Sequence, residues 1–194
     1  MLLGWTDDAV KVTGVPCPIN LPFDEKKTNT KPFWLVSGGG WGLGSLEATT
    51  RGLLKGHADC NLLVVTGENR SLYRRLKALE KKSTGRLTVT GTIPQLFNTM
   101  RNALAVLTKP GGLTVTEAMI LKKPLILLKP LPGAEEKNLD YLIRKGAAVS
   151  YDCFIKEPEM IEHWQEQYAN QQDATAKSDS SILIARWIME RIGR

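Results

Sequence analysis

Short apolar runs alternate with longer amphipathic stretches from Phe33 onward. The runs have the length and composition of buried strands, and they are Phe33–Ser37, Leu62–Thr66, Leu87–Thr90, Leu104–Thr108, Leu125–Leu128 and a weaker one at Ala147–Ser150. Helical spacing between them predicts helices at Ser45–Gly56, Arg70–Lys82, Ile93–Asn102, Thr114–Leu121 and Glu135–Lys145. Such alternation predicts a parallel sheet covered on both faces, which is a Rossmann-like, doubly wound α/β domain.

The two ends of the chain depart from this pattern. Residues 1–32 are rich in proline and polar residues, and we interpret them as a linker region that precedes a domain spanning 33–194. In the tail, apolar spacing predicts one helix over Glu157–Asn170 and another over Ala176–Arg191. The polar stretch Gln171–Ser181 is predicted to connect them.

Composition narrows the function classes. The 194 residues carry a formal net charge of +6, and the basic residues are scattered along helices, which favours solvated helix faces. Attraction to an anionic membrane surface stays open as a second interpretation. No nucleic-acid motif is present, and no apolar run reaches the roughly 20 residues of a membrane span. The three cysteines lie far apart, which indicates reduced thiols in a cytosolic protein and no structural zinc.

The first glycine-rich turn follows the first predicted strand, in the stretch SGGGWGLGS from Ser37 to Ser45. A P-loop would require Lys where Ser45 stands, and the dinucleotide fingerprint GxGxxG fails in every register. We interpret the turn as flexible backbone that approaches a diphosphate closely and offers N–H groups to it. The alternative is a tight strand-to-helix turn without a ligand.

Two further turns each open a predicted helix with a carboxylate nearby. Lys109-Pro110-Gly111-Gly112 precedes Glu117, and Pro130-Leu131-Pro132-Gly133 precedes Glu135, Glu136 and Asn138. Helix N-termini suit phosphate, and carboxylates or amides suit sugar hydroxyls, so together they predict a sugar-nucleotide site. The spacing from Thr114 to Glu117 also fits a capping box. From spacing alone, capping and ribose binding compete for the same carboxylate oxygens.

Several motifs in order resemble one family. KPGGLTVTEAM, KKPLILLKPLPGAEEKN and GAAV resemble the donor-binding half of the processive lipid glycosyltransferases of glycosyltransferase family 28, which include monogalactosyldiacylglycerol synthases and bacterial diacylglycerol glucosyltransferases. VTGVPCPINLPF resembles their interdomain linker, and SGGGWGLGSLE resembles the first loop of their C-terminal domain. The match runs from about Val12 to Val149.

The resemblance implies one half of a two-domain GT-B fold and an inverting transfer without an obligatory metal or cofactor. A UDP-sugar would be the donor, and the hydroxyl of a diacylglycerol-type lipid would be the acceptor. The implied location is cytoplasmic and peripheral, at the cytoplasmic face of a membrane.

The resemblance also implies roles for individual residues. Glu117 matches the acid that holds the ribose, and Thr92 with Ile93 matches the segment whose backbone meets uracil. The loop beside the diphosphate is matched by Gly40, Gly42, Gly44 and Ser45. The helix start that faces phosphate is matched by Gly111, Gly112, Thr114 and Thr116. Two positions near the donor sugar are matched by Glu135 and Asn138. Ala134 stands where the family commonly has Gln, which leaves the identity of the sugar open.

The resemblance places the catalytic base and the acceptor site in an N-terminal domain that this sequence does not contain. We therefore expect this chain alone to bind nucleotide without turnover, either as an excised domain or as a subunit that pairs with a separate half; self-association stays open. One rival hypothesis is a UDP-sugar epimerase, although neither His57 nor His163 follows a glycine-rich turn. Another is a non-catalytic nucleotide-binding or interaction domain, which Ala134 supports.

Overall fold

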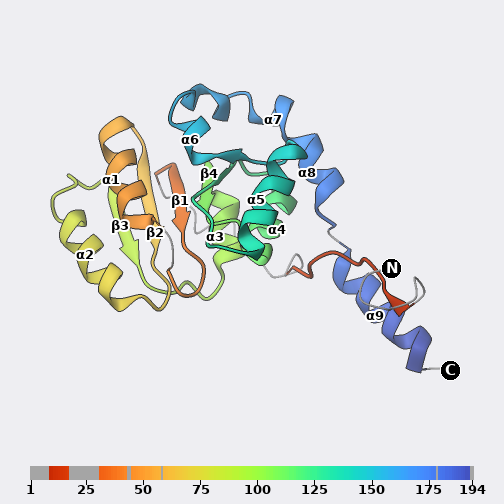
Figure 1. The fold of residues 1–194 in the computed structure, drawn as a ribbon. Helices are drawn as coiled ribbons and strands as arrows, with labels where there is room; N and C mark the ends of the chain where they lie inside the picture. The colour runs from red at the N-terminus through yellow and green to blue at the C-terminus, as the bar shows by residue number, and fades with distance from the viewer. Residues whose placement is uncertain (1–8, 18–30, 43–44, 58, 178, 193–194) are drawn as a thin grey trace.

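The structure is a computed structural model that describes residues 9–17, 31–42, 45–57, 59–177 and 179–192. Its centre is a six-stranded sheet in which every pairing is parallel, with the order β3-β2-β1-β4-β5-β6. The strands are β1 (Phe33–Ser37), β2 (Asn61–Val65), β3 (Leu87–Thr90), β4 (Ala105–Thr108), β5 (Leu125–Leu127) and β6 (Val149–Ser150). The predicted Rossmann-like, doubly wound sheet is confirmed (Figure 1).

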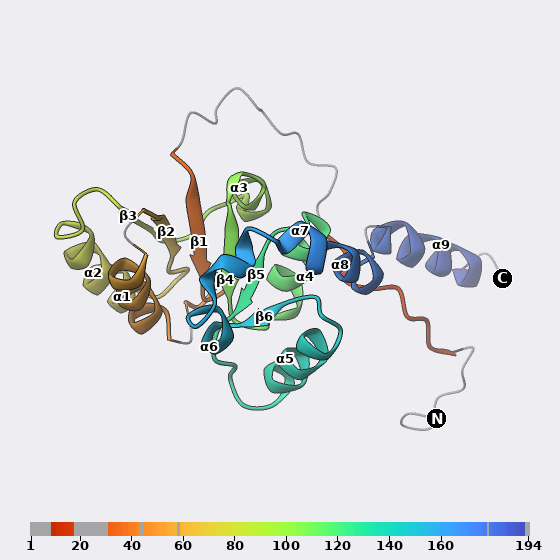
Figure 2. The same cartoon turned by 90° about the horizontal axis from the view of Figure 1, so that it is seen from above.

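Helices connect successive strands and cover both faces of the sheet. They are α1 (Leu46–Gly56), α2 (Arg70–Glu80), α3 (Leu96–Asn102), α4 (Gly112–Ile120) and α5 (Ala134–Arg144). Seen from above, α1 and α2 lie on one side of the central strands, while α3 and α4 lie on the other (Figure 2). The central strands are thus shielded from water on both faces, and Leu35 and Leu107 are fully buried. This explains why their sequences read as continuous apolar runs.

The chain reverses its direction of travel across the sheet between β1 and β4. It moves outward from β1 to β3 and then returns to the other side of β1, where Ser37 pairs with Thr108. The loops that follow these two neighbouring strands therefore leave in opposite directions. In open parallel sheets, ligands bind in the crevice that forms at such a point.

The predicted elements of the core are confirmed with small shifts at their ends. The largest shifts are at α3, which begins at Leu96 rather than Ile93, and at β6, which begins at Val149 rather than Ala147. Helix α4 begins at Gly112, two residues before the predicted start at Thr114. This last shift changes the interpretation of Glu117.

The single helix predicted over Glu157–Asn170 is wrong. The chain instead forms a 3-10 turn η3 (Pro158–Ile161) and two short helices, α7 (Trp164–Gln167) and α8 (Ala169–Thr175), after a short α6 (Tyr151–Phe154). The break between α7 and α8 falls at Tyr168, whose φ of −124° is not helical and whose ring stacks on the buried Trp164. Neither proline nor glycine marks the break, so the sequence carries no local signal for it. Part of the predicted polar connection at Gln171–Ser181 is therefore helical.

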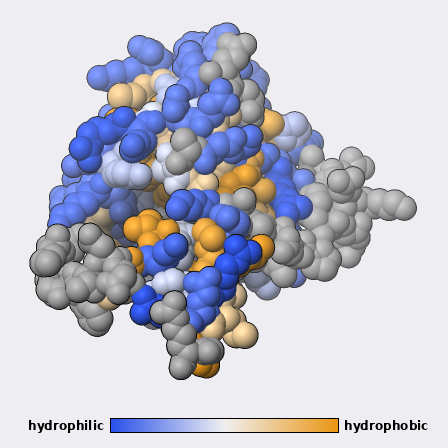
Figure 3. Space-filling model, turned by 90° about the vertical axis from the view of Figure 1, so that its right-hand side faces the viewer, coloured by the Kyte–Doolittle hydropathy of each residue, from blue (hydrophilic) through white to orange (hydrophobic). Residues whose placement is uncertain are grey.

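The last helix, α9 (Ser180–Ile192), extends from the body beside the N-terminal segment 9–17 (Figures 1 and 2). Lys177 donates a hydrogen bond to the Val12 carbonyl at 3.4 Å, which links the two ends. Helix α9 exposes Ile182, Met189 and Ile192, and apolar patches appear among charged groups on the face that carries it (Figure 3). Among the described residues, every helix is too short or too polar to span a bilayer.

Candidate functional site

A cavity of about 280 Å³ opens at the carboxyl ends of the central strands. Its walls come from the loops after β1, β2 and β3 and from the first turns of α4. The lining residues are Ser37, Gly39, Gly40, Val65, Gly67, Thr92, Ile93, Pro94, Gln95, Leu96, Phe97, Leu113, Thr114 and Glu117. This first cavity lies at the reversal of the sheet, as expected for a ligand site of a doubly wound fold.

The glycine-rich loop after β1 interlocks with the turn after β2. Glu68 donates its backbone N–H to the Gly40 carbonyl at 2.7 Å, and the Asn69 side-chain amide donates to the Gly42 carbonyl at 3.3 Å. A Cβ on Gly42 would lie 1.9 Å from the Thr66 carbonyl oxygen, whereas a Cβ on Gly40 would meet nothing within 4 Å. Gly42 is thus required by packing, while Gly40 faces open space beside the cavity.

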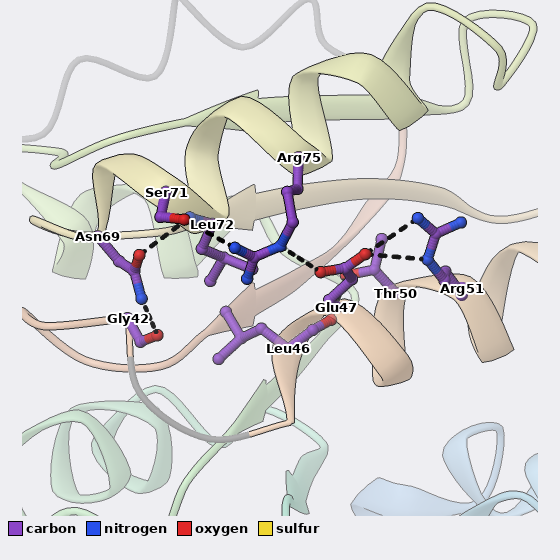
Figure 4. A network of polar contacts seen from close by, with 9 residues as sticks. All are labelled: Gly42, Leu46, Glu47, Thr50, Arg51, Asn69, Ser71, Leu72 and Arg75. Carbon is purple, nitrogen blue, oxygen red and sulfur yellow. Dashed lines mark hydrogen bonds and ion pairs between the residues drawn. The ribbon is translucent and has the colours of Figure 1, made fainter.

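Helices α1 and α2 are fixed against each other behind this loop (Figure 4). Asn69 caps α2 by accepting the Leu72 N–H at 2.9 Å. Glu47 of α1 accepts hydrogen bonds from Arg75 of α2 at 2.7 Å and from Arg51 at 3.0 Å. These hydrogen bonds lower the pKa of the Glu47 carboxyl. The glycine-rich loop is therefore held at two places. Hydrogen bonds to Gly40 and Gly42 hold the loop itself, and the contact of Glu47 with Arg75 holds α1, the helix that follows it.

Glu117 lies on α4 and lines the first cavity. Because α4 begins at Gly112 with Gly111 as its cap, Thr114 lies inside the helix, and of the two alternatives that the spacing left open the capping box is excluded. Glu117 is only 7% exposed, and no hydrogen bond or ion pair reaches its carboxylate from the part of the chain that the structure describes. Burial raises its pKa. A buried carboxylate without a donor is unfavourable, so this group is suited to a ligand that brings hydroxyl donors.

The opposite wall of the cavity is more apolar. It comes from the loop after β3, where Thr92 and Ile93 precede Leu96 and the buried Phe97. Leu113, which is 52% exposed, faces this loop from the start of α4. A slot with apolar sides and backbone groups along its edge is suited to a flat base.

Other residues that the sequence indicated line a second cavity of about 210 Å³ between α4, α5 and α8. Gly111, Gly112, Thr116 and Asn138 belong to it rather than to the first. Thr116 donates its hydroxyl hydrogen to the Gly112 carbonyl at 2.7 Å, and Asn138 donates to the Pro110 carbonyl at 2.9 Å. Both side chains therefore fasten the turn that opens α4.

Glu135 is engaged with the protein rather than exposed to the first cavity. One of its carboxylate oxygens lies 2.5 Å from the Lys109 ammonium nitrogen, and the other accepts the Leu131 N–H at 3.0 Å. The neighbouring Glu136 accepts the Gly133 N–H at 2.9 Å and so caps α5. Lys109 was not among the residues predicted for the site, although it opens the turn that contains Gly111 and Gly112.

The structure thus divides the predicted site residues into groups. The first cavity brings together Gly40, Thr92, Ile93, Thr114 and Glu117, whereas Gly42 and Ser45 support it from outside. Gly44 lies outside the described residues. Sequence reasoning missed the other nine residues that line the first cavity, which are Ser37, Gly39, Val65, Gly67, Pro94, Gln95, Leu96, Phe97 and Leu113. Gly67 had a usable signal, since it follows a predicted strand.

Neither described histidine faces the first cavity. His57 caps the C-terminal end of α1, and its ring stacks on Phe154 at a centroid distance of 5.5 Å and lies tilted against Trp34 at 5.0 Å. Burial lowers its pKa. His163 is exposed at the start of α7. Within the described ranges, no group of three or more His, Cys, Asp or Glu residues is arranged to hold a metal ion.

Cys17 approaches α4 from the N-terminal segment. Burial and, to a smaller extent, the nearby negative charge of Glu117 together raise the pKa of its thiol to about 11. The thiol is therefore neutral at physiological pH and is a poor nucleophile.

Sequence comparison identifies relatives with one shared name. The chain is 37% identical over 121 residues to a processive diacylglycerol beta-glucosyltransferase of Bacillus cereus strain AH187, which covers 62% of this chain and 31% of the relative. It is 33% identical over 159 residues to the protein of that name from Bacillus subtilis, which covers 76% of this chain and 41% of the relative. The resemblance inferred from the motifs is confirmed. No family model matches the sequence.

Solved structures share the fold at low sequence identity. The Acinetobacter baumannii MurG structure superposes with a TM-score of 0.60 at 18% identity, over 85% of this chain and 51% of that one. A Neisseria meningitidis UDP-GlcNAc 2-epimerase, solved with UDP-GlcNAc bound, gives a TM-score of 0.54 at 15% identity, over 84% of this chain and 45% of that one. The fold is therefore that of one half of a GT-B glycosyltransferase. The chain spans about a third to two fifths of the length of its sequence relatives.

Proposed function

We propose that this chain is the UDP-sugar-binding domain of an inverting glycosyltransferase that transfers a hexose to the hydroxyl of a diacylglycerol-type lipid. The observation that carries the proposal is the Glu117 carboxylate, which is buried at the cavity without a partner among the described residues. The shared name of the relatives supports the reaction and the acceptor. Action at the cytoplasmic face of a membrane follows from that acceptor and belongs to the proposal.

In the proposed complex, each wall of the first cavity takes one part of the nucleotide. The apolar wall around Ile93 and Phe97 takes uracil, with the backbone at Thr92 and Ile93 along its edge. Glu117 accepts hydrogen bonds from both ribose hydroxyls in a charge-assisted pair. Gly40 leaves room for the diphosphate to approach the backbone of the glycine-rich loop, and the start of α4 at Thr114 faces it.

The reaction that we propose is a single displacement at C1 of the sugar. The lipid hydroxyl oxygen attacks C1 from the face opposite to UDP, the C1–O bond to UDP breaks, and the configuration at C1 inverts. The hydroxyl proton passes to a base, which the resemblance places in the other half of the enzyme. The glycine-rich loop and the helix starts stabilise the charge that grows on departing UDP, and the fixed nucleotide holds C1 in line for attack.

A calorimetric titration of the chain with UDP tests the proposal, with ADP and NADH as controls. We expect selective binding of UDP, because in the proposed complex the backbone at Thr92 and Ile93 meets the edge of uracil, whereas the ribose diol that Glu117 binds is common to all three ligands. Failure of a folded sample to bind UDP, or equal binding of UDP and NADH, would overturn it. A non-catalytic nucleotide-binding domain is separated from an enzyme by assaying sugar transfer in a longer protein that contains this domain.

An epimerase is the second candidate, because the UDP-GlcNAc 2-epimerase structure shares this fold. That reaction requires acids and a histidine beside the sugar. His57 packs against Trp34 and Phe154 and lines a depression with Pro32 and Asn61, at the amino ends of β1 and β2. Because the first cavity lies at the carboxyl ends of these strands, the geometry favours the transferase.

A further inference from the structure

Lys109 is a cation held at the edge of the first cavity. It directly follows β4, whose last residue Thr108 pairs with Ser37 at the start of the glycine-rich loop. A Cβ placed on Gly39 would lie 3.1 Å from the Lys109 Cε, and a Cβ on Gly111 would lie 3.8 Å from it. The stem of Lys109 thus passes beside Gly39 of the glycine-rich loop and beside Gly111 of its own turn, and neither residue has a Cβ in its way.

The charge of Lys109 is balanced by the carboxylate of Glu135, which also accepts a hydrogen bond from the backbone. The side chains of Lys109 and Glu135 are 20% and 15% exposed, so both ends of this pair are largely withdrawn from water. Glu135 keeps its other hydrogen bond, from the Leu131 N–H, and lies in the first turn of α5, where the helix dipole favours an acid. Glu135 therefore remains stabilised if Lys109 moves to another anion.

We propose that Lys109 binds the diphosphate of the donor and that Glu135 is its exchangeable counter-ion while the site is empty. The inference rests on the proposed function, because the diphosphate is that of the UDP-sugar. A diphosphate brings more than one negative charge to the glycine-rich loop beside the Lys109 stem, so it competes effectively with a single carboxylate. Binding then exchanges one ion pair for another instead of burying an unpaired charge.

Titration with uridine and UDP isolates the phosphate contribution. Uridine reports on the base and ribose contacts, and only UDP reports on Lys109. We expect Lys109→Met to weaken UDP binding about tenfold or more while uridine binding stays within about twofold. Lys109→Arg should restore most of the loss. Lys55→Met, which removes an exposed charge on α1, is the matched control and should leave both affinities unchanged.

Glu135→Gln should change the affinity for UDP in the opposite direction from Lys109→Met. It therefore distinguishes an exchangeable counter-ion from an ion pair that only maintains the fold. Without the competing carboxylate, UDP should bind several-fold more tightly and should raise the melting temperature more than in the wild type, with uridine binding unchanged. Lys109→Met combined with Glu135→Gln restores charge balance, and this variant keeps the test valid if Lys109→Met alone unfolds.

The outcomes also separate this inference from the proposed function. Wild-type binding of uridine and UDP with no effect of Lys109→Met on UDP would overturn the role of Lys109 and leave the nucleotide site standing. Equal losses of UDP and uridine binding in Glu135→Gln would show that the ion pair only maintains the fold, and would overturn the exchange. Absence of binding of either ligand to the wild type would overturn both proposals.

Discussion

Burial of the Glu117 carboxylate without a partner lowers the stability of the empty protein. The raised pKa expresses this cost, since the folded state holds the proton more tightly than the unfolded chain does. Stability associated with Glu117 is therefore present at low pH and is lost as pH rises through the raised pKa. A residue kept at such a cost is best explained by the ligand that it binds.

Replacing Glu117 by Gln should separate stability from binding. We expect a higher melting temperature at neutral pH, because no charge remains buried. Affinity for uridine and UDP should fall about 5- to 30-fold, because a neutral amide loses the charge-assisted part of the ribose contact, worth about 1–2 kcal/mol. Scanning calorimetry and titration measure the two effects. Glu157→Gln on the exposed surface is the control, and unchanged affinity in Glu117→Gln would contradict the ribose role.

The same carboxyl should give uridine binding a pH dependence. The ribose hydroxyls donate to the ionised form, so affinity should be constant at high pH and should weaken as pH falls through the raised pKa of Glu117. The loss should begin at a higher pH than for an ordinary glutamate, near 4.5. Uridine is the proper ligand because it has no phosphate to titrate in this range. Titrations with uridine across pH, on the wild type and on Glu117→Gln, test this prediction. A pH dependence that persists in the variant would show that another group causes it.

At the scale of the elements, the glycine-rich loop combines a structural requirement with a binding surface, and two alanine substitutions separate them. Gly42→Ala should strongly destabilise the protein, since its Cβ would overlap the Thr66 carbonyl and its φ is +55°. Gly40→Ala has open space for its Cβ, so the melting temperature should stay within about 2 °C while UDP affinity falls, because the methyl group occupies room for the diphosphate. Urea unfolding and titration distinguish the two. Equal destabilisation would contradict this division of roles.

The sequence was informative where local pattern decides the structure. Buried strands such as β1 and β4 are continuous apolar runs because helices cover both of their faces. Their positions, and the alternation of strand and helix along the chain, could therefore be predicted. The break at Tyr168 could not, because its non-helical φ of −124° falls where neither proline nor glycine marks the sequence. The pairing of Lys109 with Glu135 joins residues from two different turns. Such contacts follow from the sheet order, which the sequence pattern leaves open.

At the scale of the whole molecule, the described residues form a cavity that we propose binds nucleotide, but they offer no candidate base for the acceptor hydroxyl. Glu117 is assigned to the ribose in the proposed complex, Glu135 is paired with Lys109, and His57 lies at the other end of the sheet. The relatives are about two and a half to three times as long as the region matched here. The division of labour that we infer is donor binding in this chain and proton removal in another part of the enzyme.

We therefore expect the chain alone to bind UDP and to transfer nothing. Incubation with UDP-glucose and vesicles that contain diacylglycerol should release UDP no faster than a sample without protein, since we find no candidate base for the lipid hydroxyl among the described residues beside the first cavity. Coupled detection of UDP and chromatography of the lipids measure the two products, and the Bacillus subtilis relative is the positive control. Glycolipid formation by this chain would contradict the prediction and would require a base among its own residues. Substituting Glu117 and Glu135 in turn would then locate that base. Glu117 lines the first cavity, and Glu135 is paired with Lys109 in the turn that opens α4.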